Sequence, residues 1–274
     1  MLVLLAALTI AVLAPAFHYH QFGEATRMAR DAGLSALFVC GSVIAVFGTI
    51  RAFRREIESG TMQMALAHPV SRTVFFLSKT AGAFAAYLVF SFVVLCVLLT
   101  MVVGADIGGK IAEQTGDVAR LWGPSLASGV GVMLVPLVGG AALNRFARCR
   151  FVLSAFVIAA LVAAGVATWA TVRDAPLVFR MLPAVVTLSV LTLVLLAAAA
   201  AFSVRLKANA SSSATGVVLL LFLPAVGNYY LSDALSRGGT VAWSYVGLAA
   251  LAAAPAVLLF LLLGVHLING QDIS

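Results

Sequence analysis

Residues 80–105, TAGAFAAYLVFSFVVLCVLLTMVVGA, decide the class of fold, because this run contains no charged side chain. A helix needs roughly 20 mostly apolar residues to cross the hydrocarbon layer of a membrane. Strands of a membrane barrel would instead alternate apolar and polar residues. The run is continuously apolar, so it predicts a membrane-spanning helix.

The rest of the chain repeats this pattern. Of its 274 residues, 63% are hydrophobic and 10% are charged, whereas a soluble domain carries about 25% charged residues. We therefore predict an all-α integral membrane protein, in which residues 1–274 form a single transmembrane domain. Its polytopic bundle would have six to eight transmembrane helices, and the number stays open because the seventh segment is short and contains Pro224. The apolar segments are 1–17, 34–53, 80–105, 121–144, 151–172, 181–204, 214–231 and 241–268.

The lysines and arginines predict the orientation, since cytoplasmic loops are enriched in these residues. Two dense clusters, within 51–55 and 145–150, fall on the same side of the predicted bundle. We therefore place this side, and both termini, in the cytoplasm. The predicted outer loops are 18–33, 106–120, 173–180 and 232–240, and a short linker, Asn209–Ser213, lies on the cytoplasmic side.

The sequence lacks the residues that catalysis or cofactor binding would require. The apolar interiors contain no acidic or basic side chain, and the motif-like stretch 104–111 has Ile111 where a phosphate-binding loop needs Ser or Thr. We predict a non-catalytic chain that binds no cofactor. Its net charge of +7 is scattered among short loops, so no nucleic-acid partner is expected.

Histidines 18 and 20 lie near the predicted outer interface of the first span. A metal site needs further ligands, and none is evident from the other histidines. We predict no metal site, and metal binding by His18 and His20 remains the open alternative to an anchoring role at the membrane surface.

The longest predicted cytoplasmic stretch, residues 54–79, reads RREIESGTMQMALAHPVSRTVFFLSK. Ser59 or Thr61 can cap a short helix, because small hydroxyl side chains accept hydrogen bonds from free helix N–H groups. Pro69 cannot continue that helix. Ser71 can then cap the third span. A short, partly apolar helix between two spans suits docking into a groove on a cytoplasmic protein.

This stretch resembles a known family. Its pattern is Glu58-x-Gly60-Thr61-x4-Leu66-x2-Pro69-Val70-Ser71-Arg72-x6-Lys79. It is similar to the segment after the second span in ABC-2 type transporter permeases, in particular the NosY-like branch of stand-alone permease subunits. The close match covers about 25 residues, and the remainder agrees in hydropathy and length.

The resemblance implies that residues 54–79 contain a coupling helix that sits on a separate ATPase subunit. Glu56 and Glu58 would then pair with basic residues of that ATPase. The residues that the resemblance places at or beside the contact are Glu56, Glu58, Gly60, Thr61, Met62, Leu66, Pro69 and Arg72.

The resemblance also implies the assembly. Two cytoplasmic ATPase subunits would bind ATP and magnesium, and a second permease subunit, identical or paralogous, would complete an ATP-driven exporter in a bacterial inner membrane. The cycle would export a substrate or do mechanical work on a partner outside. A membrane anchor or assembly subunit without transport is the alternative. Asn228, Tyr229 and Tyr230 are candidates for a substrate path, although packing is favoured for them.

Overall fold

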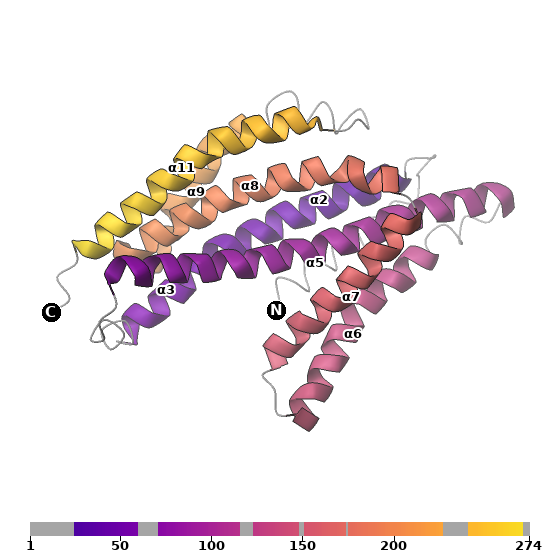
Figure 1. The fold of residues 1–274 in the computed structure, drawn as a ribbon, viewed down its shortest axis with the longest axis horizontal. Helices are drawn as coiled ribbons and strands as arrows, with labels where there is room; N and C mark the ends of the chain where they lie inside the picture. The colour runs from indigo at the N-terminus through magenta and orange to yellow at the C-terminus, as the bar shows by residue number, and fades with distance from the viewer. Residues whose placement is uncertain are drawn as a thin grey trace. The chain divides into compact units, whose positions relative to one another are not determined.

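The computed structural model describes residues 25–59, 71–115, 123–147, 151–173, 175–226 and 241–270. Within these ranges all regular structure is helical, which confirms the predicted all-α class (Figure 1). The helices are α2 (Ala25–Val43), the π-helix η2 (Ile44–Gly48), α3 (Thr49–Glu58), α5 (Arg72–Thr115), α6 (Gly123–Ala147), α7 (Phe151–Arg173), α8 (Ala175–Arg205), α9 (Ala208–Val226) and α11 (Trp243–Asn269).

Four stretches among the described residues are long and apolar enough to cross a membrane: Arg30–Glu58, Arg72–Val103, Phe179–Arg205 and Trp243–Asn269. Shorter apolar helices occur at Leu134–Phe146, Ser154–Trp169 and Ala208–Leu221. The chain is thus a helical membrane protein. The predicted first span, 1–17, lies outside the described residues, so the choice between six and eight spans stays a prediction.

Three predicted outer loops contain long helical stretches, which corrects the sequence prediction. Helix α2 already begins at Ala25, inside the predicted loop 18–33. Helix α5 continues through Thr115 into the predicted loop 106–120, and α8 begins at Ala175 inside the predicted loop 173–180. Lys, Ala, Glu and Gln, which occupy 110 and 112–114, are strong helix formers. Since hydropathy marks only the part of a helix within hydrocarbon, it missed these polar extensions. The phosphate-loop-like stretch 104–111 is likewise helix and not loop.

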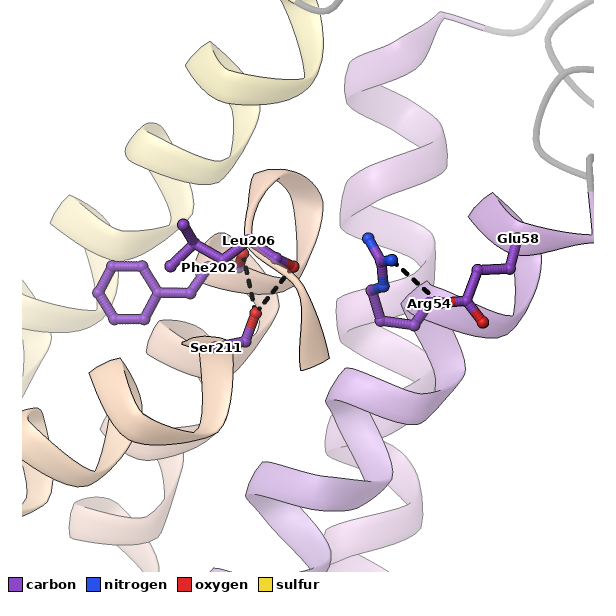
Figure 2. A network of polar contacts seen from close by, with 5 residues as sticks. All are labelled: Arg54, Glu58, Phe202, Leu206 and Ser211. Atoms are coloured by element: carbon purple, nitrogen blue, oxygen red, sulfur yellow. Dashed lines mark hydrogen bonds and ion pairs between the residues drawn. The ribbon is translucent and has the colours of Figure 1, made fainter. Parts of the chain in front are cut away.

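The prediction of a linker at Asn209–Ser213 is also wrong, because these residues lie in the first turns of helix α9. Its serine hydroxyls find acceptors within the helical backbone: those of Ser212 and Ser213 donate to the Asn209 carbonyl at 2.8 and 3.0 Å. The Ser211 hydroxyl lies 3.2 Å from the Phe202 carbonyl oxygen and 3.1 Å from that of Leu206 (Figure 2). These bonds satisfy carbonyls that end α8, so the corner between α8 and α9 needs only two residues.

Helices α2, η2 and α3 form one uninterrupted rod. Val43 and Thr49, at the two ends of the π-helix, both have right-handed helical backbone angles (φ −60°, ψ −46° and φ −67°, ψ −50°). A π-helical turn widens the hydrogen-bonded ring, and such turns occur often at functional sites. The apolar sequence of this region does not indicate a π-helical turn.

The chain divides into two compact units, residues 1–40 with 89–185 and residues 41–88 with 186–274. In the first unit, α6 and α7 lie side by side as a hairpin (Figure 1). Gly140 of α6 approaches the backbone of α7: a methyl group added to it would lie 3.1 Å from the Ala155 Cα atom and 2.8 Å from its Cβ. The absence of a side chain at Gly140 therefore lets α6 and α7 approach closely.

The second unit is held by two apolar clusters. One joins α8, α9 and α11 through Val194, Val218 and Ala253, beside an edge-to-face pair of Phe202 and Phe260 rings with centroids 5.8 Å apart. The other joins α3, α5, α8 and α11, and it lies beside the residues predicted to be functional.

The outward surface of α11 is strongly apolar. Leu251 is 75% exposed and Leu262 is 69% exposed, and Leu248, Leu258 and Leu259 are similarly open. A helix with such a face is stable only in hydrocarbon or against another protein.

Candidate functional site

The end of α3 presents the predicted acidic residues. Arg54 Nη2 donates to Glu58 Oε1 at 2.9 Å, which is an (i, i+4) ion pair on the helix surface (Figure 2). The Glu58 side chain is 63% exposed, so the pair is solvated and contributes at most about 0.5 kcal/mol. The Ser59 N–H donates to the Arg55 carbonyl at 3.0 Å and ends the helix.

The start of α5 is capped as predicted. The Val74 N–H donates to Ser71 Oγ at 3.3 Å, and the Phe75 N–H donates to the Ser71 carbonyl at 3.1 Å. The side chain of Ser71 thus satisfies an amide that has no partner within the helix. This confirms Ser71 as the cap of the third span.

Three helix ends are connected by polar contacts. The Lys79 ammonium of α5 donates to the Glu56 carboxylate of α3, and both side chains are only partly exposed. Arg72 of α5 donates through Nη1 to the Asn269 carbonyl of α11 at 3.3 Å. A cation beside the C-terminal carbonyls of a helix also interacts favourably with the helix dipole.

An aromatic cluster lies beside these contacts. The rings of Phe53 and Phe76 have centroids 5.6 Å apart and an interplanar angle of 43°. Phe76 is fully buried, and Ile268 of α11 packs in the same cluster. At Gly264 an added methyl group would fall 2.2 Å from the tip of the Phe76 ring, so the ring occupies the space that a side chain would need.

We call this arrangement the platform: residues 53–59 at the end of α3, 71–79 at the start of α5, and 264–269 at the end of α11. It holds both ends of the segment 60–70. Among the described residues, no group of three or more His, Cys, Asp or Glu side chains could hold a metal ion. The platform thus has charged groups near its surface and packed aromatic rings beneath them.

Comparison with protein families decides the identity of the chain. The family model of ABC-2 family transporter proteins matches residues 1–148. The chain belongs to the ABC-2 transporter family. It is therefore a membrane component of the ABC transporter type, and membership implies an ABC ATPase as partner. No curated protein and no solved structure matched the chain.

The match to the ABC-2 family includes the platform residues of α3 and α5 and ends before α11. Among the predicted site residues, Glu56, Glu58 and Arg72 lie within the described part of the permease. The remaining predicted positions lie outside it: Gly60, Thr61, Met62, Leu66, Pro69, Asn228, Tyr229 and Tyr230, and also His18 and His20.

The structure of this ABC-2 permease adds residues that sequence reasoning missed. Glu56 has a cation of its own chain beside it, Lys79, at a separation of 23 positions. Phe53, Phe76 and Gly264 form the buried part of the platform. Phe53 and Phe76 each lie close to basic residues in the sequence, and this proximity could have indicated that they belong to the site. The sequence around Gly264 contains no comparable indication.

Proposed function

We propose that this chain is the permease subunit of an ATP-driven exporter, and that its platform receives the movement of a separate ATPase through residues 60–70. The observation that carries the proposal is the Glu56–Lys79 ion pair, which joins the two helix ends flanking that segment. The Arg72 contact extends the connection to α11. A force on the segment would therefore reach three helices together.

The packing of the platform supports this role. The polar contacts join the helix ends, but ion pairs near a surface are weak and add little stiffness by themselves. Fully buried rings can transmit a load between helices, because a close-packed cluster resists compression and passes strain to its neighbours. Phe76, with no exposed surface, contacts α3 and α11 at once.

The proposal includes the full assembly. Two ATPase subunits would bind ATP and magnesium, and two permease chains, identical or paralogous, would form the membrane part. Residues Gly60, Thr61, Met62, Leu66 and Pro69 would make the ATPase contact together with Glu56, Glu58 and Arg72. Both termini would lie in the cytoplasm of a bacterium, and the NosY-like branch is the proposed relationship. The apolar helices favour a hydrophobic or amphipathic cargo.

Co-purification of the permease with the ABC ATPase encoded beside it tests this proposal. Leu66→Asp should abolish the complex, because a carboxylate cannot enter an apolar groove without losing its hydration. Leu66→Met should retain it. Arg145→Glu is a control for general charge effects, since this exposed residue lies at the end of α6.

Transmission through the platform is tested separately by ATPase activity in the assembled complex. Glu56→Lys and Lys79→Glu should each reduce the permease-dependent change in ATPase rate, and the double exchange should restore it. A complex and an ATPase rate indifferent to Leu66→Asp and to both single exchanges would overturn the proposal in favour of a membrane anchor or assembly subunit.

A further inference from the structure

A groove of about 450 Å³ runs between the η2–α3 segment and the first half of α5. Its volume lies in the range of small-molecule sites. The lining residues are mostly small and apolar, with Ser78, Lys79 and Thr49 as the polar members: Ile44, Gly48, Thr49, Ala52, Ser78, Lys79, Gly82, Ala83 and Ala86. Gly48, Ala52, Gly82 and Ala86 are exposed, so the groove is open.

One buried hydroxyl in this groove has no acceptor. Thr49 is 1% exposed, and its Oγ1 atom has no hydrogen-bond partner among the described residues. Other threonines in the described helices donate to a carbonyl of the preceding turn, as Thr80, Thr100, Thr192 and Thr215 do four residues back. Thr49 follows the π-helical turn, where the carbonyls are displaced from their α-helical positions. A buried hydroxyl of this kind calls for an acceptor from outside the chain.

The groove is polar mainly at one end. On the α5 wall, Ser78 and Lys79 lie one to two helical turns before Gly82 and Ala86. On the other wall, Ala52 and Ile44 lie at opposite ends. Towards the polar end, the platform carries the cations Arg54, Arg55, Arg72 and Lys79 against the carboxylates Glu56 and Glu58, and Arg51 lies just before it on α3. An excess of cations near a membrane surface attracts anionic lipids.

We propose that this groove binds one anionic glycerophospholipid from the surrounding bilayer. An acyl chain lies along Gly48, Gly82, Ala83 and Ala86, the Thr49 hydroxyl donates to an ester or phosphate oxygen, and the phosphate faces Lys79. A second permease helix is the competing occupant, because small residues spaced by four also favour helix contact. The lipid fits better, since it supplies an acceptor for Thr49 and a counter-charge for the cation-rich end.

The inference goes beyond the proposed function and does not depend on it, because it needs only a permease placed in a membrane. Its test is native mass spectrometry of the full-length permease in neutral detergent, titrated with phosphatidylglycerol or phosphatidylcholine of identical chains. Phosphatidylglycerol should bind about fivefold more tightly, the effect of roughly one cation near the headgroup. Added salt should reduce this preference.

Variants of the groove give the decisive comparison. A methyl group added at Gly82 meets no protein atom within 4 Å, and Gly82 lines the groove, so Gly82→Leu is chosen to fill it. It should remove the retained lipid. Ala85→Leu, an exposed change on the same helix outside the lining, should leave lipid binding unchanged. Thr49→Val should weaken binding, and Thr49→Ser should restore it.

Three results would overturn the inference. Equal lipid retention by the wild type and Gly82→Leu would show that the groove is not the site. Equal binding of the two lipids, or displacement by inorganic phosphate alone, would remove the anionic lipid as the ligand. Dissociation of permease copies by Gly82→Leu with lipid binding intact would assign the groove to a second copy of the chain.

Discussion

The α6–α7 hairpin and the platform each depend on a glycine, but the atoms that face the glycine differ. Gly140 faces the backbone of Ala155, whereas Gly264 faces the tip of the Phe76 ring. Backbone atoms of a helix cannot move aside without shifting the whole helix, while a ring can tilt within its cluster. The helices are therefore fixed in two ways: by close backbone approach in one unit, and by packed side chains in the other.

The surroundings of the two contacts reinforce this difference. One face of α6 is exposed, at Leu134, Val138 and Phe146, and its opposite face packs on α7. The platform adds ion pairs and a capped helix start to its aromatic cluster. Lipid competes with apolar side chains inside a membrane, so packing and not hydrophobic burial stabilises both contacts.

Breaking the hairpin should give the largest effect. Gly140→Val forces side-chain atoms against the Ala155 backbone, and we expect a loss of stability near the upper end of the roughly 1–3 kcal/mol that overpacking costs. The measurement is the thermal midpoint of size-exclusion recovery in detergent. Gly131→Val is the matched control on the same helix, because nothing lies within 4 Å of a methyl group there. An equal loss in both variants would contradict the backbone contact.

A side chain added at Gly264 should reduce stability less than one added at Gly140. Gly264→Ala displaces only the end of the Phe76 ring, so we expect about 1 kcal/mol, from the lower part of the overpacking range. Gly247→Ala on the same helix α11 has open space and should leave the midpoint unchanged. A second change, Phe76→Leu, should relieve the strain of Gly264→Ala. Failure of that rescue would mean that the ring is not the obstacle.

The smallest effect should come from the exposed ion pair. Glu58→Gln removes the partner of Arg54, and we expect a change of at most about 0.5 kcal/mol. The same thermal measurement at low and high salt checks this, since salt screens the charge of the wild-type pair. A loss above 1 kcal/mol would indicate that the ion pair, and not the aromatic cluster, holds the end of α3.

Sequence reasoning predicted the helical class and the Ser71 cap, because hydropathy and capping are local properties. It did not predict the Glu56–Lys79 pair, whose partners meet only after two helices have packed. It also missed the π-helix η2, since an apolar run has the same composition with or without an extra residue per turn. The polar helix extensions were missed because hydropathy indicates which residues lie in the membrane, and not where the helical backbone ends.

The contact of Arg72 with the Asn269 carbonyl spans 197 positions of the chain. During synthesis, the ribosome makes the end of α3 and the start of α5 long before the residues of α11 that complete the platform. Until α11 has been inserted, Phe76 lacks its neighbours Gly264 and Ile268. We therefore expect nascent or truncated chains that end before α11 to lack a finished platform.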